Sequence, residues 1–149
     1  MMTGKFILAS AAALAFASPQ SAAAASEWPL VPGDFVEMSS ITVDDGHMLD
    51  YAKHLAGLWR DSQDYAKQQG WISNYQVWIN EYPRAGEPDV YLVVWFPGFA
   101  DPAEALKREE AYKAHMKMTT AQMQEASGQR AEYRKLAGSM LFKNYTWAK

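Results

Sequence analysis

Histidines and carboxylates at helical spacing are the first residues in this chain that could support chemistry. His47, Asp50, His54 and Asp61 follow one another at intervals of three, four and seven residues, so a helix would bring them to one side. Imidazole and carboxylate groups in such a row can hold a metal ion. However, at about 100° per residue Trp59, the centre of the apolar stripe, lies roughly 140° from His54. We therefore interpret the row as a polar face exposed to solvent.

His115 lies at the edge of a second predicted apolar stripe. Tyr112 precedes it by three residues and Thr119 follows it by four, which makes the three side chains neighbours on a helix. A histidine that faces a pocket can act as a general acid or base near neutral pH. His115 and Tyr112 are therefore the catalytic candidates. The alternative is a histidine at the edge of the core, hydrogen-bonded to a backbone or hydroxyl group as buried polar groups normally are.

Two predicted strands carry the candidates for ligand binding. Polar groups interleaved with aromatic rings suit a mainly apolar pocket with a few orienting groups. The substrate-binding candidates are Gln76, Trp78, Asn80, Tyr91 and Trp95. For the first three of them, a solvent-exposed strand face or the rim of a dimer interface is an equally good explanation. For Tyr91 and Trp95, the alternative is packing in the core or in an interface.

These strands form a predicted β-hairpin, Trp71–Tyr82 and Val90–Phe96, rich in the β-branched and aromatic residues that favour a pleated surface. The second strand is apolar on both faces, which predicts that both faces are covered. A chain of this length has few helices for that purpose. We therefore expect the second cover to be another copy of the chain, in a homodimer. A long loop or the C-terminal helix folded over this face is the alternative.

Two helical regions flank the hairpin. The first, His47–Gln69, shows three- and four-residue apolar spacing and ends at Gly70. The second opens with Asp101 as the cap, a proline at the first helical position and Glu104 completing a capping box. This region runs at least to Lys117 and then, past a bend at Thr119-Thr120, to about Leu136. The first and last strands of the chain are predicted over Asp34–Val43 and Met140–Trp147.

The predicted order is β-α-β-β-α-β, so the fold class is α+β, with helices on one face of a four-stranded antiparallel, ferredoxin-like sheet. From Asp34 to Trp147 this order, the first helix ending at Gly70 and the doubly apolar third strand resemble the dimeric α/β-barrel superfamily. Its members include antibiotic-biosynthesis-monooxygenase-like, stress-responsive A/B-barrel and NIPSNAP-like proteins. The resemblance implies a barrel of two sheets and a pocket between helices and sheet. It also raises a haem-binding alternative, with His115 as the axial ligand.

The N-terminal residues resemble a secretory signal peptide. Lys5 is followed by the apolar run Phe6–Ala17, and Ala23–Ala25 supplies small residues for cleavage. The run is shorter than the ~20 residues of a membrane span, although an uncleaved anchor is the alternative. We expect residues 1–25 to be a signal peptide, 26–33 a linker and 34–149 a single domain. The expected location is the periplasm or the medium, with no membrane contact after cleavage.

Composition narrows the classes of function. The formal net charge is −3 and there is no cysteine, so nucleic acid is not expected as a partner, and disulfides and cysteine-based chemistry are excluded. The first hypothesis is an exported protein that binds a small molecule. Its chemistry would be proton transfer or cofactor-free monooxygenation of an aromatic or apolar substrate. The second is a haem-binding barrel, and the third is a non-enzymatic interaction module. The expected partners are a second copy of the chain and a small-molecule ligand.

Overall fold

The structure is a computed structural model that describes residues 28–149. The predicted signal peptide, residues 1–25, and its cleavage site lie outside the described residues. In chain order the elements are β1 (Leu30–Val43), α1 (Met48–His54), η1 (Leu55–Trp59), α2 (Arg60–Gln68), β2 (Asn74–Ile79), β3 (Val90–Phe96), α3 (Pro102–Met116), α4 (Thr120–Arg130) and β4 (Arg134–Trp147).

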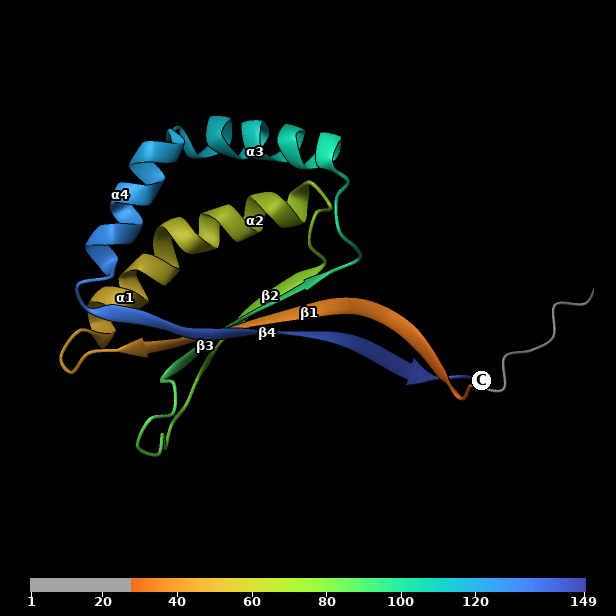
Figure 1. Cartoon of the computed structure of the whole chain (residues 1–149), viewed down its shortest axis with the longest axis horizontal. Coiled ribbons are helices and arrows are strands. Elements are labelled where there is room, and N and C mark those ends of the chain that lie inside the picture. The colour runs from red at the N-terminus through yellow and green to blue at the C-terminus, as the bar shows by residue number, and fades with distance from the viewer. Residues whose placement is uncertain (1–27) are drawn as a thin grey trace, which may run out of the picture.

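The four strands form one antiparallel sheet in the order β2-β3-β1-β4. The helices lie on one side of this sheet (Figure 1). One helical region lies between β1 and β2 and the other between β3 and β4, and the central strands of the sheet are β3 and β1. The protein is therefore an α+β protein, compatible with the predicted ferredoxin-like fold.

The two faces of the sheet carry different side chains. Residues paired directly across neighbouring strands point to the same face, so Trp78, Tyr91, Trp95 and Met140 share the face away from the helices. The opposite face includes Ile41, which pairs with Val90 and, on its other side, with Leu136.

The core lies between α1–η1 and the helix-covered face. Its buried cluster consists of Ile41, Val43, Tyr51, Leu55 and Val90. The apolar spacing of the first helical region predicts a face packed against the sheet, and Tyr51 and Leu55 lie on that face. Trp59, Leu92 and Tyr133 pack against the cluster from its edge. The elements α1, η1 and α2 form one continuous stretch, the first helical segment. This packing holds the first helical segment in one orientation on the sheet.

The first and last strands of the chain are longer than the sequence predicts. β1 begins at Leu30, so residues 30–32 of the predicted linker pair with β4, and the register then shifts between Pro32 and Phe35. β4 begins at Arg134, within the region predicted to be helical as far as Leu136. Both extensions depend on pairing between segments about a hundred residues apart, such as Ser39 with Ser139, which local patterns do not encode. Beyond the end of β3, β1 and β4 continue as a two-stranded ribbon (Figure 1).

The second helical region divides where the sequence predicts a bend. The Asp101 carboxylate accepts a hydrogen bond from the backbone N–H of Glu104 at 2.8 Å, which confirms Asp101 as the cap of α3. The Glu104 carboxylate instead accepts from Arg108 Nε at 2.9 Å, so the predicted capping box is only half formed. α3 ends at Lys117, whose φ is 53°. Thr119 then caps α4 with a complete capping box.

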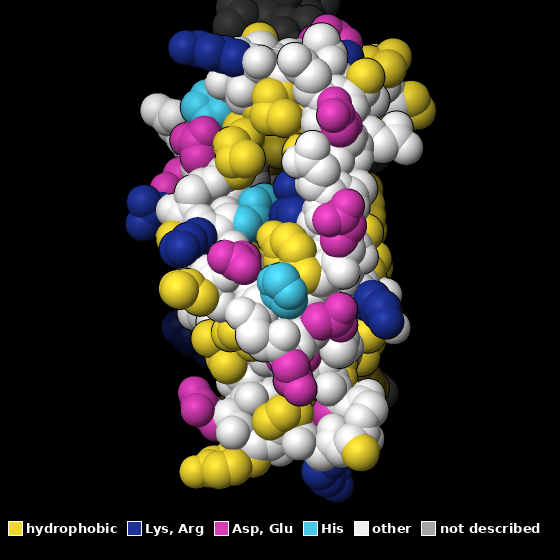
Figure 2. Space-filling view, turned by 90° about the vertical axis from the view of Figure 1, so that its left-hand side faces the viewer, with side chains coloured by type: hydrophobic (Ala, Val, Ile, Leu, Met, Phe, Trp, Pro, Cys, Tyr) yellow, Lys and Arg dark blue, Asp and Glu magenta, His cyan; other side chains and the backbone are white. Residues whose placement is uncertain are grey.

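The face of the molecule seen in Figure 2 shows no concentration of charge of one sign. Figure 2 shows acidic and basic side chains interspersed on the end of the molecule that carries α1 and α4. This agrees with the small negative net charge of the chain. Within residues 28–149, no helix combines the length and the apolar character that crossing a bilayer requires.

Candidate functional site

A π-helical turn in the first helical segment shapes the candidate site. η1 spans Leu55–Trp59, and Gly57 within it has the non-helical values φ −99° and ψ −106°. A π turn takes up an extra residue, so the positions before and after it change phase. His54 and Trp59 thereby come to line the same cavity. The expectation that His54 lies on a solvated face, which assumed one regular helix, is wrong.

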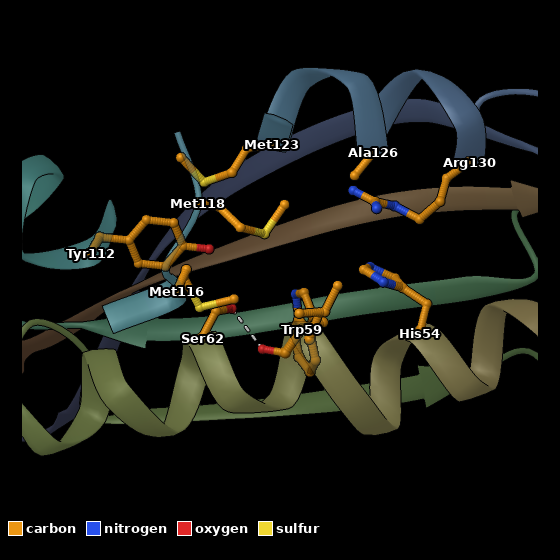
Figure 3. Close-up of a pocket in the computed structure, with 10 residues that line it drawn as sticks. His54, Trp59, Ser62, Tyr112, Met116, Met118, Met123, Ala126 and Arg130 are labelled. Carbon is orange, nitrogen blue, oxygen red and sulfur yellow. Dashed lines mark hydrogen bonds between the residues drawn. The ribbon is translucent and has the colours of Figure 1, made fainter. Parts of the chain in front are cut away.

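The cavity lies between the first helical segment and the α3–α4 pair (Figure 3). Its volume is about 140 Å³, close to the ~150 Å³ of a cavity that holds benzene. The first segment contributes one wall, and the end of α3, the connection and α4 contribute the other. The lining residues are His54, Leu58, Trp59, Ser62, Tyr112, Met116, Met118, Met123, Ala126 and Arg130.

Apolar and adaptable side chains make up the middle of the cavity. Three methionines, Met116, Met118 and Met123, lie opposite Trp59 (Figure 3). Methionine is flexible and polarisable, and its sulfur makes favourable contacts with aromatic rings. These walls therefore suit a small aromatic or apolar molecule.

Ser62 completes the wall on α2 without offering its hydroxyl to the cavity. It is buried, and its hydroxyl donates to the backbone carbonyl of Trp59 at 2.7 Å (Figure 3). A serine back-bonded to the preceding turn satisfies a carbonyl in a helix. The bond therefore supports the irregular turn that places Trp59.

The polar end of the cavity pairs a histidine with an arginine. The Arg130 guanidinium points into the cavity toward the His54 imidazole (Figure 3). Burial, reinforced by the positive charges of Arg130 and Arg134, lowers the pKa of His54 to about 4. His54 is therefore neutral near pH 7 and can donate or accept a hydrogen bond. Its ring also stacks on the buried Tyr51, with centroids 6.0 Å apart.

Tyr112, one of the two predicted catalytic residues, lines the opposite end. Its hydroxyl points into the cavity (Figure 3). It comes from α3, one turn before the helix ends, and the left-handed Lys117 then turns the chain so that Met118 also reaches the cavity. The cavity thus has a hydroxyl at one end and nitrogen donors at the other.

His115, the other predicted catalytic residue, does not line this cavity. Its ring stacks on Tyr65 at a centroid distance of 4.0 Å, and its Nε2 lies 3.4 Å from Asp61 Oδ2. Tyr65 and Asp61 both belong to α2, so these contacts join α3 to α2. The geometry supports a packing role for His115. Its role as a general base stays a prediction.

The predicted ligand-binding residues of the hairpin lie across the sheet from the cavity. Trp78 and Trp95 meet edge to face at 6.4 Å, and Trp78 Nε1 donates to Gln76 Oε1 at 2.7 Å. Tyr91 pairs with Trp78 on the same face. The structure therefore brings Gln76, Trp78, Tyr91 and Trp95 together on the sheet face away from the helices, which we call the free face. His115 and Tyr112 lie on the other side of the sheet.

Asn80 serves the turn of the hairpin. Its Nδ2 donates to the Pro88 carbonyl at 3.2 Å, and its Oδ1 accepts from the backbone N–H of Tyr82. An asparagine that bonds nearby backbone groups is a common device for closing a turn. Its predicted role in ligand binding stays a prediction.

The cavity does not fit a bound haem. A cavity that matches benzene in volume is far smaller than a porphyrin, and His115, the predicted axial ligand, lies outside it. Within residues 28–149 no group of three or more His, Cys, Asp or Glu side chains is placed to hold a metal ion. His47 and Asp50 form only an exposed pair at 3.3 Å.

Sequence reasoning missed His54 and Arg130 as residues of the site. His54 was placed on the wrong face because the π turn is invisible to a regular helical wheel. Arg130 lies at the end of a helix, where basic residues are common. Its position in the sequence therefore gives no indication that it belongs to the site. The irregular position of Gly57 inside an otherwise good helix pattern was the one local hint.

Comparison with known proteins adds no family to this description. No family model matches the chain, and no curated protein matches it.

Proposed function

We propose that this protein binds a small, largely apolar or aromatic molecule in the cavity between the first helical segment and the α3–α4 pair. The observation that supports this most directly is the cavity itself, where three methionines and Trp59 form an apolar middle and polar groups stand at both ends. Such a distribution is typical of ligand pockets, where a few polar groups orient a mainly apolar ligand.

Binding accounts for the cavity better than proton-transfer catalysis does. A general base works best when its pKa lies near the working pH, and the pKa of His54 is about 4. His115, the other candidate base, is engaged by Tyr65 and Asp61 outside the cavity. We therefore place binding first, and enzymatic chemistry on the bound molecule second.

The proposal includes a homodimer formed through the free face of the sheet. That face carries Trp78, Met140 and Phe142, each of which is 44–48% exposed, with Trp95 and Tyr91 beside them. Apolar side chains gathered on one face commonly mark an interface. Two copies joined there would form the barrel that the resemblance implies, and each cavity would stay on the outer side of its own sheet.

The proposal also places the mature domain outside the cytoplasm. The support is the signal-peptide pattern of residues 1–25. Expression of the full chain in a Gram-negative host, followed by mass measurement of the periplasmic product, tests it. A chain that begins near Ser26 is expected, and an intact chain in the cytoplasm would contradict it.

Filling the cavity tests the binding function. Ala126 lines it from α4, so A126F should place a ring where a ligand ring would lie. Fragments carrying one aromatic ring should bind the wild type at millimolar concentration by ligand-observed NMR and lose binding to A126F. The matched control is A103F, at an exposed position near the start of α3, which should keep it. Binding that survives A126F would place the ligand elsewhere.

A further inference from the structure

Arg130, which lines the polar end of the cavity, and the nearby Arg134 have no acidic partner among the described residues. Arg130 ends α4 and Arg134 begins β4, and the Nε atom of each is buried without a hydrogen bond. Among residues 28–149, Arg130 forms no ion pair within 4 Å, and Arg134 makes one side-chain bond, from Nη2 to Ser127 Oγ at 3.4 Å. The structure therefore holds two positive charges here that no carboxylate balances.

Withdrawing even part of an unpaired charge from water is costly, and proteins usually pair such groups. Burial and the nearby positive charge of Arg134 lower the pKa of Arg130. The charged form of Arg130 is therefore less favourable here than it would be in water. Besides Arg134, the ionisable groups whose charges act on Arg130 are the hydroxyls of Tyr51, Tyr112 and Tyr133. None of them is a carboxylate. Groups that break a folding rule in this way are often those that meet a ligand.

We propose that the ligand of this cavity carries a carboxylate on a single ring or short apolar body, and that Arg130 binds this carboxylate. The inference rests on the proposed binding function and names the chemical class of the ligand. The carboxylate would meet the guanidinium at the cavity end shared with His54, and the ring would lie between the methionines and Trp59.

The shape and charge of the site favour a carboxylate. A guanidinium presents a planar fork of N–H donors that matches the two oxygens of a carboxylate. The neutral His54 imidazole can add one N–H bond to the same group. A volume of about 140 Å³ holds one ring and a small substituent. The hydroxyl of Tyr112, at the far end, can meet a polar substituent on the other side of the ring.

Three probes of nearly equal size test the proposal: benzoate, benzyl alcohol and benzylamine. Titrated into the protein near pH 7, benzoate should bind about tenfold more tightly than benzyl alcohol, because a charge-assisted bond adds roughly 1.5 kcal/mol over a neutral contact. Benzylamine should bind most weakly, because its ammonium group would face two arginines.

Substitution of Arg130 then locates the effect. R130Q should reduce benzoate affinity by about tenfold and leave benzyl alcohol affinity within about twofold. The control is R84Q, which removes the same charge from an exposed arginine of the hairpin loop and should change neither affinity. R130Q should also melt no lower than the wild type, because it removes an unpaired charge.

The possible outcomes separate this inference from the proposed function. Equal binding of benzoate and benzyl alcohol to the wild type would overturn the carboxylate inference and leave the binding function standing, as would full benzoate affinity in R130Q. If none of the three probes binds, the binding function fails and the inference fails with it. The wild-type comparison needs no variant, so the test holds even if R130Q does not fold, in which case R134Q replaces it and should weaken benzoate binding severalfold.

Discussion

His54 and Trp59 lie five residues apart in one continuous helical segment, and both face the same cavity. In a regular α-helix these positions would lie roughly 140° apart. The π turn of η1 removes that separation, because it inserts a residue without adding a full turn. Irregular turns of this kind are frequently found at functional sites. The site thus depends on a local departure from the helix that carries it.

Deletion of Gly57 should therefore disrupt the fold. Without the extra residue, α1 would rotate by about 100° relative to α2, and the buried Tyr51 and Leu55 would leave the core. We expect a loss of about 3 kcal/mol or more in the free energy of unfolding, measured in urea. G57A keeps the residue count, and a Cβ there meets nothing within 4 Å, so the free energy of unfolding should change by no more than about 1 kcal/mol in either direction. Equal stability of the deletion and the wild type would show that the phase of α1 is unimportant.

Stability should fall as the pH drops through the range in which His54 titrates. The pKa of His54 is about 4 in the folded protein, against an ordinary value of 6.5. Between these values the unfolded chain binds more protons, so the free energy of unfolding decreases with decreasing pH. We expect a loss of about 1 kcal/mol between about pH 7 and about pH 5, because His54 is only half-buried and the effect is discounted for solvent screening.

H54Q should remove this contribution to the pH dependence. The matched control is H47Q, since His47 lies on the surface beside Asp50 and outside the cavity. Urea unfolding curves of the three proteins at the two pH values provide the measurement. A pH dependence that is unchanged in H54Q would mean that His54 is not the group responsible.

Leu55 and Leu49 offer a matched test of the core. Both lie on the first helical segment, but Leu55 is buried and Leu49 is 65% exposed. L55A should cost about 2–4 kcal/mol, since it removes buried apolar surface and leaves a cavity. L49A should stay within about 0.5 kcal/mol of the wild type. Similar costs for both, measured in urea, would contradict the observed orientation of the helix.

Asp101 should stabilise the start of α3 through its hydrogen bond to the backbone N–H of Glu104. D101A removes the acceptor and should lower the free energy of unfolding by about 1 kcal/mol. D101N keeps an acceptor oxygen at the same place and should lose only a few tenths of a kcal/mol. Thermal unfolding followed by circular dichroism compares the two, and an equal loss in both would point to charge rather than capping.

Met140 and Leu141 test the proposed dimer, because they are adjacent on β4 and face opposite sides of the sheet. Met140 is 44% exposed on the free face and Leu141 is 53% exposed on the other. The wild type should have twice the mass of one chain by light scattering. M140E should reduce it to a monomer, because a charge would be buried in the interface, while L141E should remain a dimer. A monomeric wild type would refute the dimer directly.

Local patterns in the sequence were sufficient for several elements. The alternation of β-branched and aromatic residues predicted β3 at Val90–Phe96, as observed. Asp101, with proline after it, marked the start of α3, and Thr119 marked the division before α4. These features depend on residues within one or two turns of each other, so the sequence carries them directly.

Elements defined by distant partners were predicted less well. The ends of β1 and β4 follow from their mutual pairing, for instance that of Leu30 with Trp147. No local sequence pattern near Leu30 or Arg134 predicts that pairing. Their predicted bounds therefore fell short by four residues at β1 and by six at β4.

The sequence by itself determined the order of elements, Asp101 as the cap of α3 and the apolar character of both faces of β3. It also indicated Tyr112, which lines the cavity. Only the tertiary structure decided which side chains share a cavity. It brought His54 and Arg130 together from segments far apart in the chain, and it placed Trp78 and His115 on opposite sides of the sheet. The physical reason is that caps and strand propensities act between near neighbours, whereas a cavity depends on how whole elements pack and on one irregular turn at Gly57.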